Sequence, residues 1–159
     1  MKARPPERSY WIGVVSRDHV ARGVAGGFAQ LNHGKAGPLE RMQPGDGLVY
    51  YSPRTTFPDG APLQAFTAIG RISPGALYES RDAGEALFRR RVSYLPAAEA
   101  PIKPLIEELS FIRSKTHWGA AFRFGVVRIP AEDFARIAVA MGCDFGREPT
   151  SHSAEAHST

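Results

Sequence analysis

The alternation of apolar and polar residues along the chain predicts five strands. Successive side chains of a strand point to opposite faces, so a period of two in residues of high β propensity indicates a strand. The second, third and fourth predicted strands follow one another without room for crossover helices, and we expect them to pair antiparallel. The five predicted strands are residues 9–16, 48–52, 63–73, 88–95 and 121–129.

Apolar residues at three- and four-residue spacing predict three short helices. Asp18 is the expected N-cap of the first helix, which runs to about Val24 and is stopped by Gly26 and Gly27. The second helix is predicted at 101–109 and the third at 131–141. The segments without a clear period are predicted to be connections: 28–38, 53–62 and 80–85.

Five or more strands with short helices between them do not form a regular series of parallel units. The pattern favours an α+β fold with a mixed, strongly bent sheet, partly closed into a barrel with peripheral helices. We expect one domain over residues 1–146. Residues 147–159 are polar, lack large apolar side chains and are predicted to be a flexible tail.

Composition places the chain among ordinary globular proteins. Its 159 residues can bury a core, and 43% of them are hydrophobic while 23% are charged. The single cysteine, Cys143, excludes an intrachain disulfide and a cysteine-built zinc site, and it favours a reducing, cytoplasmic location. The N-terminus does not resemble a signal peptide, and no segment approaches the ~18 apolar residues that a membrane span needs.

Charge and the spacing of reactive residues narrow the function. The formal net charge of +4 permits nucleic-acid binding without requiring it. His19, His33 and His117 lack the spacing of metal ligands, and the sequence has neither a nucleophile elbow nor a phosphate-binding glycine motif. We therefore expect no metal, no cofactor and no enzymatic activity.

Aromatic and basic residues carry the remaining chemistry. In the strand 48–52, Tyr50 and Ser52 share one face and Tyr51 takes the other. Trp118 precedes a glycine in a predicted turn, where it either packs at an edge or walls a flat slot for a base. Arg90 falls on an apolar strand face, and the favoured interpretation is that it reaches outward at a barrel end. Residue type alone favours core packing over a base slot for each aromatic side chain.

Many spaced motifs resemble the EVE-domain family from Tyr10 to Met141. They include Asn32-His33-Gly34-Lys35-Ala36, Pro44-Gly45-Asp46, Tyr50-Tyr51-Ser52-Pro53, the run from Pro62 to Gly70, Phe88-Arg89-Arg90, Leu95-Pro96, Ala100-Pro101-Ile102, Ser110-Phe111-Ile112, Trp118-Gly119 and Phe122-Arg123. The resemblance implies a PUA-like fold similar to YTH and ASCH domains. It also implies a pocket for a modified base, such as 5-methylcytosine in DNA, with any cutting done by a separate nuclease.

The resemblance, with residue chemistry, also assigns a site. Asn32 would read the base edge, Trp11 and Trp118 would stack or floor the slot, and Tyr50 with Ser52 would line it while Tyr51 packs the barrel. Basic residues would contact phosphate. The predicted ligand-binding residues are Trp11, Asn32, His33, Lys35, Tyr50, Tyr51, Ser52, Arg54, Arg90, Trp118 and Arg123.

Three other functions stay open at this point. PUA-like folds also bind RNA, so an RNA-binding module is one alternative. A small ASCH-like enzyme acting on a nucleoside is another, with His33 or His117 as its acid–base group. The third is an interaction domain without a small ligand.

Overall fold

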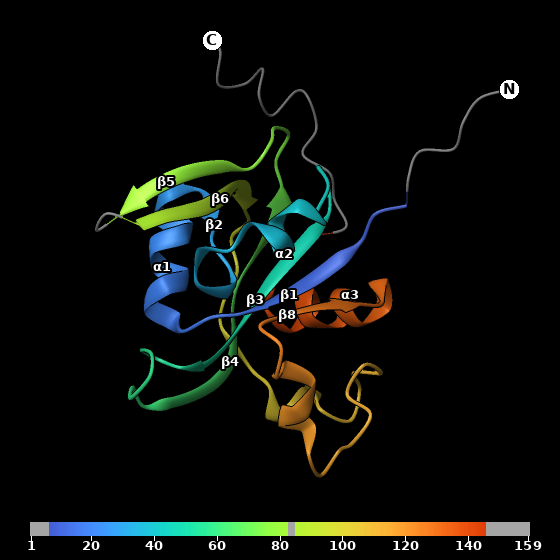
Figure 1. Ribbon diagram of the computed structural model, residues 1–159. Coiled ribbons are helices and arrows are strands. Elements are labelled where there is room, and N and C mark those ends of the chain that lie inside the picture. The colour runs from blue at the N-terminus through green and yellow to red at the C-terminus, as the bar shows by residue number, and fades with distance from the viewer. Residues whose placement is uncertain (1–6, 83–84, 146–159) are drawn as a thin grey trace, which may run out of the picture.

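The computed structural model describes residues 7–82 and 85–145, which form one mixed sheet with helices on both faces (Figure 1). The predicted tail lies outside the described residues. The strands are β1 (Tyr10–Val14), β2 (Phe28–Ala29), β3 (Gly47–Arg54), β4 (Pro62–Ile72), β5 (Tyr78–Asp82), β6 (Glu85–Tyr94), β7 (Ala100–Pro101) and β8 (Val126–Ile129). The α-helices are α1 (Arg17–Gly26), α2 (Ala36–Glu40) and α3 (Ala131–Ala140).

The sheet has the strand order β2-β6-β4-β3-β1-β8, with β5 paired to β6 and β7 paired to β4. Only β1 and β3 pair in parallel among these; β3 with β4 and β4 with β6 are antiparallel, as predicted. The sheet curls strongly, so that β5 and β6 fold over α1 (Figure 1). The α+β class, the mixed bent sheet and the peripheral helices are thus confirmed.

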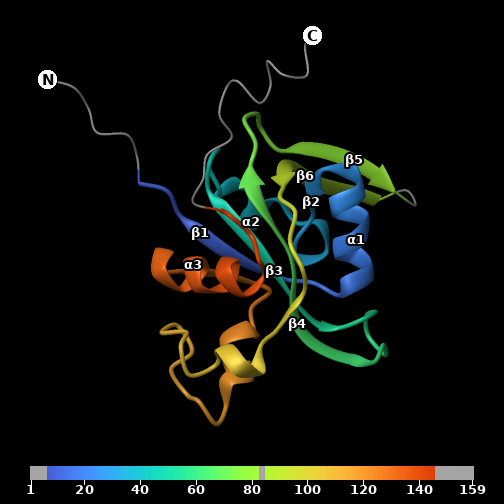
Figure 2. The same ribbon diagram turned by 180° about the vertical axis from the view of Figure 1, so that it is seen from behind.

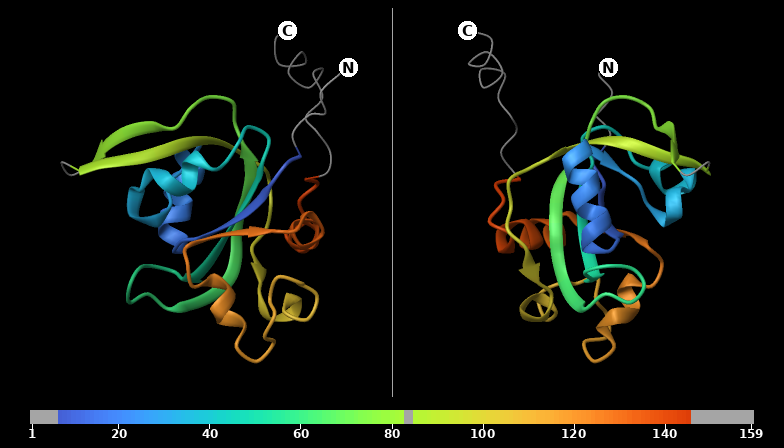
Figure 3. Two further views of the ribbon diagram at one scale, coloured as in Figure 1. Left: turned by 45° about the vertical axis from the view of Figure 1, so that its right-hand side comes forward. Right: turned by 90° about the vertical axis from the view of Figure 1, so that its left-hand side faces the viewer.

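Strand β3 is buried on both faces and separates two hydrophobic cores. Val49 and Tyr51 belong to the core that α3 covers, whereas Leu48 and Tyr50 belong to the core under α1 and α2. Figure 3 shows α1 and α2 on one side of β3 and β4 and α3 on the other, and Figure 2 shows the face that α3 covers. The two neighbouring tyrosines therefore pack in different cores.

Several predicted boundaries are wrong, and the chain itself gives the reasons. The segment 101–109 forms β7, a 3-10 helix at Lys103–Leu105 and turns instead of an α-helix, in a stretch where Pro104 offers no backbone donor. The strand predicted at 121–129 begins only at Val126, because Trp118–Phe122 form a 3-10 helix and Gly125 then takes a left-handed turn conformation (φ 76°). The segments predicted as connections contain β2 and overlap with α2 and β5.

Helix α1 begins two residues earlier than predicted. Ser16, not Asp18, is its N-cap, and Asp18 lies in the first turn, where its carboxylate accepts a hydrogen bond from the Ser16 hydroxyl (2.6 Å). An acidic side chain in a first turn also complements the helix dipole. The helix ends at Gly27, which adopts the left-handed conformation (φ 70°) that favours glycine. Across the described residues, no helix has the length and apolar character needed to span a membrane.

Asp133 of α3 holds the loop at residues 110–111 against that helix. Its carboxylate is fully buried and accepts hydrogen bonds from the backbone amides of Ser110 (3.0 Å) and Phe111 (2.9 Å) and from the Ser110 hydroxyl (2.8 Å). Asp133 thus differs from its exposed neighbour Glu132, which lies on the solvated face of the helix. The Asp133 carboxylate satisfies three donors at a partly buried site.

Replacement of Asp133 by alanine should destabilise the protein. The Asp133→Ala change leaves three partly buried donors without their acceptor, and we expect the free energy of unfolding to fall by roughly 1–3 kcal/mol. Urea denaturation followed by circular dichroism measures the change. Glu132→Ala, at the exposed neighbouring position of the same helical turn, is the control and should have little effect. Equal stabilities of the two variants would contradict this role for Asp133.

Candidate functional site

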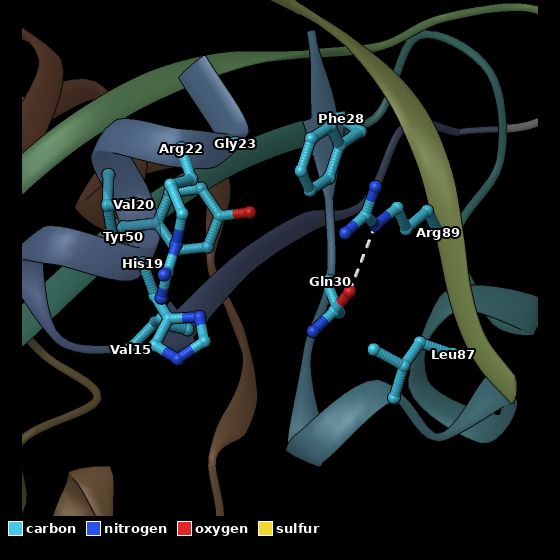
Figure 4. Close-up of a pocket in the computed structure, with 10 residues that line it drawn as sticks. All are labelled: Val15, His19, Val20, Arg22, Gly23, Phe28, Gln30, Tyr50, Leu87 and Arg89. Atoms are coloured by element: carbon cyan, nitrogen blue, oxygen red, sulfur yellow. Dashed lines mark hydrogen bonds between the residues drawn. The ribbon is translucent and has the colours of Figure 1, made fainter. Parts of the chain in front are cut away.

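A pocket of about 170 Å³ opens between α1, β2 and β6 (Figure 4). It lies on the side of the sheet that carries the core under α1 and α2, with Tyr50 of β3 at its back. Figure 4 shows His19 and Tyr50 on one side of the open space and Phe28, Gln30 and Arg89 on the other. Its lining residues are Val15, His19, Val20, Arg22, Gly23, Phe28, Gln30, Tyr50, Leu87 and Arg89.

The back wall is held by two phenols. The Tyr94 hydroxyl donates to the Phe28 carbonyl (2.8 Å) and lies 3.1 Å from the Tyr50 hydroxyl. Burial raises the pKa of Tyr50 well above its ordinary range, and burial together with Tyr50 does the same to the pKa of Tyr94. Both phenols are therefore neutral hydrogen-bonding groups near pH 7.

Gly13 of β1 makes room for the Tyr50 ring. A Cβ at this position would lie 2.7 Å from Leu31 Cδ2 and 3.1 Å from Tyr50 Cε1. The register of β1 and β3 places Gly13 opposite Tyr50. The ring can thus lie against the neighbouring strand only because residue 13 has no side chain.

Gln30 is oriented by Arg89. The Gln30 side-chain oxygen accepts a hydrogen bond from Arg89 Nε (3.0 Å), and the Arg89 guanidinium lies 4.0 Å from the centroid of the Phe28 ring. Figure 4 shows the Gln30 amide nitrogen directed away from Arg89, toward the side of His19. The pocket therefore presents an amide donor whose orientation is fixed by a charge-assisted hydrogen bond.

His19 contributes a neutral ring. Burial, and then the positive charge of Arg22, lowers the pKa of His19 below its ordinary value of 6.5, against the weaker attraction of Asp18. At pH 7 the imidazole is uncharged and offers one N–H donor and one acceptor. The group can pair with a donor or an acceptor on a bound molecule.

A second pocket of about 390 Å³ adjoins the first and shares Val15, His19 and Gln30 with it. Phe122 lines it and stacks on Tyr51 (ring centroids 4.1 Å apart). Its other lining residues are Val14, Ser16, His33, Pro53, Arg54, Thr56, Phe57, Arg123, Phe124 and Gly125.

The described residues that line the two pockets carry positive charge. They include Arg22, Arg54, Arg89 and Arg123, and none of these described residues is an aspartate or a glutamate. Arg54 donates to the Gly60 carbonyl (2.8 Å), and the Arg22 guanidinium lies 3.9 Å from the Asp18 carboxylate just outside the lining. The positive charge of the two adjoining pockets attracts an anion to this surface. Within the described residues, no three His, Cys, Asp or Glu side chains are grouped so as to hold a metal ion.

The fold brings four of the predicted site residues to these pockets: Tyr50 to the first, and His33, Arg54 and Arg123 to the second. Lys35 is exposed at the residue before α2. The backbone of Asn32 lies in a 3-10 turn (Asn32–Gly34), and its side chain is outside the described part of the structure.

The other predicted residues line neither pocket. Ser52 is fully buried and shares a hydrogen bond with the Thr67 hydroxyl (2.8 Å). Tyr51, whose pKa burial raises to about 12, lies behind Phe122, and Trp118 packs against both rings. Each of these contacts is with the protein's own interior.

Trp11 and Arg90 also have partners inside the fold. The Trp11 indole donates to the buried Asp46 carboxylate (2.9 Å). Arg90 donates to the carbonyls of Met42 (2.8 Å) and Leu39 (3.3 Å) and is only 7% exposed. The expectation that Arg90 reaches outward at a barrel end is therefore wrong, because two backbone acceptors after and within α2 hold it inside.

Sequence reasoning left most of the first pocket out of the predicted site. Phe28 and Gln30 alternate with the fully buried Ala29 and Leu31. That period of two in a segment predicted as a loop was the available signal for Gln30. Phe57 lies in a proline-rich stretch without periodicity, and nothing in the local pattern indicated that it lines the same pocket as Arg123.

Comparison with known proteins places the chain in a context. The family model described as the EVE domain matches residues 9–140. A UPF0310 protein of Mycolicibacterium vanbaalenii is 50% identical over 145 residues, covering 91% of this chain and 97% of the relative. The UPF0310 protein YdcG of Bacillus subtilis is 45% identical over 135 residues, covering 84% and 92%.

A solved structure shares the fold at low sequence identity. The YTH domain of the Zygosaccharomyces rouxii MRB1 protein, in complex with N6-methyladenosine RNA, superposes with a TM-score of 0.59. It is 14% identical, and the match covers 87% of this chain and 90% of that domain. This likeness supports the PUA-like architecture.

The titration of His19 tests the geometry of the first pocket. We expect a midpoint below 6.5 because burial and the Arg22 charge both disfavour the imidazolium. The Arg22→Gln change removes that charge and should raise the midpoint without restoring the full ordinary value. NMR titration of the His19 ring protons measures both. A midpoint at or above 6.5 in the parent protein would contradict the partial desolvation of His19 at the edge of this pocket.

Proposed function

The chain belongs to the EVE-domain family, and we propose that it is a nucleic-acid-binding reader that holds one modified base in the pocket of Figure 4. The observation that carries this proposal is a small first pocket with fixed hydrogen-bonding groups that adjoins the second, arginine-lined pocket. The first pocket receives the base, and the arginines of the second pocket contact the phosphates.

The size of the pocket suits a single base. Pockets for drug-sized ligands measure roughly 300–1,000 Å³, and this one measures about 170 Å³. Phe28 and the His19 ring provide flat faces on opposite sides of the open space (Figure 4). A planar heterocycle can stack in such a space while its edge meets polar groups.

The polar groups favour a base edge rich in acceptors. The Gln30 amide and the Arg22 guanidinium are donors, and neutral His19 can donate or accept. Cytosine presents two acceptors, N3 and O2, and one donor, its N4 amino group. We propose a modified cytosine in DNA, such as 5-methylcytosine, as the ligand; the resemblance to the EVE family supports the same choice.

The likeness to a YTH domain solved with N6-methyladenosine RNA supports a second candidate, a modified base in RNA. The two candidates differ in the sugar and in the size of the base. A purine needs more of the 170 Å³ pocket than a pyrimidine does. Direct comparison of DNA and RNA ligands separates the candidates. In either case we propose binding without turnover, and cleavage of nucleic acid would require a separate nuclease partner.

Edge reading by Gln30 is testable with a near-isosteric variant. The Gln30→Leu change removes the amide while keeping the shape of the side chain, so we expect the preference for 5-methylcytosine over other bases to fall by roughly 5- to 100-fold. Fluorescence anisotropy of single-stranded oligomers measures it, using DNA with 5-methylcytosine or cytosine and RNA with N6-methyladenosine. Arg113→Gln, in an exposed loop outside both pockets, is the control.

Three outcomes of that experiment are distinguishable. Unchanged discrimination in the Gln30 variant would place the base elsewhere. Tighter binding of the RNA oligomer by the parent protein would replace the DNA proposal by the RNA candidate. Failure of the parent protein to bind any oligomer would contradict the reader function itself.

The phosphate contacts should make binding sensitive to salt. With about three phosphates neutralised, a plot of log K against log salt concentration should have a slope near −2 to −3. The Arg123→Gln change removes one cation of the second pocket and should make the slope shallower by about one. Anisotropy titrations at several salt concentrations measure the slopes. A flat response would mean that the base is recognised without its phosphates.

A further inference from the structure

We propose that the second pocket is a binding subsite for the nucleotide next to the read base, so that the protein takes a single-stranded segment of at least two nucleotides. The proposal rests on the function proposed above and extends it to a second position on the strand. The subsite is the 390 Å³ pocket, and its distinguishing residues are Phe57 and Phe124.

Two exposed phenylalanines on one pocket call for an explanation. Phe57 is 70% exposed and Phe124 is 74% exposed. In the described part of the chain only two other large apolar side chains, Val24 and Val139, are exposed in this way, and neither lines this pocket. Exposed aromatic faces are the groups on which successive bases of a single strand stack.

Both aromatic rings are attached to ordered parts of the fold. The Phe57 ring meets the His33 ring edge to face, with centroids 5.9 Å apart. Phe124 directly precedes Gly125, whose carbonyl accepts a hydrogen bond from the Val14 amide of β1 (2.7 Å). Phe122, which also lines this pocket, stacks on Tyr51. The Phe57 and Phe122 rings thus have packing partners and the backbone after Phe124 is hydrogen-bonded, which reduces the entropy lost on binding.

The charge of this pocket favours a nucleotide over an apolar peptide. Arg54 and Arg123 line it, and no carboxylate of the described part of the chain does. The combination of arginines with exposed aromatic rings matches the alternating phosphates and bases of a single strand. An acidic peptide would match the charge but would leave the two flat rings without planar partners.

The position of the pocket fits the neighbouring nucleotide. It shares Val15, His19 and Gln30 with the base pocket, so one ligand can fill both without leaving the surface. A base inside a duplex stacks on its own neighbours and is not free to stack on Phe57 or Phe124. The occupant is thus a nucleotide of a single-stranded or locally unpaired segment.

Abasic substitution on the ligand, combined with alanine substitution on the protein, tests the subsite. The ligands are single-stranded DNA oligomers that carry one 5-methylcytosine and a full set of bases, an abasic site on its 5′ side, or an abasic site on its 3′ side. The proteins are the parent, Phe57→Ala, Phe124→Ala and the control Val139→Ala, which truncates an exposed apolar residue of α3 outside both pockets.

We expect at least one phenylalanine variant to bind the full oligomer about 5- to 150-fold more weakly than the parent. One of the two abasic oligomers should show a similar loss with the parent protein, and the same phenylalanine variant should bind that oligomer no more weakly than the parent does. Val139→Ala should bind like the parent. Circular dichroism checks that the variants remain folded, as expected for exposed positions.

The outcomes separate this inference from the proposed function. If the parent protein binds the full oligomer and both phenylalanine variants bind it equally well, the subsite is refuted and the reader function stands. Equal losses on all three oligomers would also refute it, because the rings would then act without the neighbouring base. If the parent binds no oligomer, both proposals fail. Competition by an acidic peptide at comparable concentration would assign the pocket to a protein partner instead.

Discussion

The burial of β3 on both faces is the constraint on which the rest of the structure depends. A strand in this position must pair with neighbours on both edges, and it does so with β1 in parallel and β4 antiparallel. Two separate cores then have to be covered, one by α3 and the other by α1 and α2. The buried Asp46 carboxylate fixes the beginning of β3. It accepts hydrogen bonds from the Ser9 amide, the Trp11 indole and the Gln43 amide.

The site follows from the same constraint. The core under α1 and α2 ends at Tyr50, whose ring reaches the pocket because Gly13 leaves space beside it. The curl of the sheet brings β6 over α1, so Arg89 and Leu87 face His19 across the pocket (Figure 4). The opposite core provides the support under the second pocket, where Tyr51 backs Phe122. One strand thus contributes Tyr50 to the lining of the first pocket and Tyr51 to the support behind Phe122 of the second.

Sequence reasoning predicted the fold class, the antiparallel run of three strands and the alternation of the two tyrosines, because these depend on local periodicity and turn residues. Tyr50 rather than Tyr51 was assigned to the pocket from the family resemblance and residue chemistry, because alternation alone does not distinguish the two faces of β3, which are both buried. Ser52 and Arg90 were assigned to the site by residue type, yet the fold gives Ser52 a partner in Thr67 and Arg90 two backbone carbonyls. Such pairings join segments far apart in sequence and leave no local trace.

The central claim is that a nucleobase enters the pocket between α1, β2 and β6. Intermolecular NOEs between the methyl groups of the protein and a short oligomer containing 5-methylcytosine test it most directly. The account predicts contacts from the modified base to Val15, Val20 and Leu87, which line this pocket. Contacts confined to methyl groups outside this pocket would contradict it.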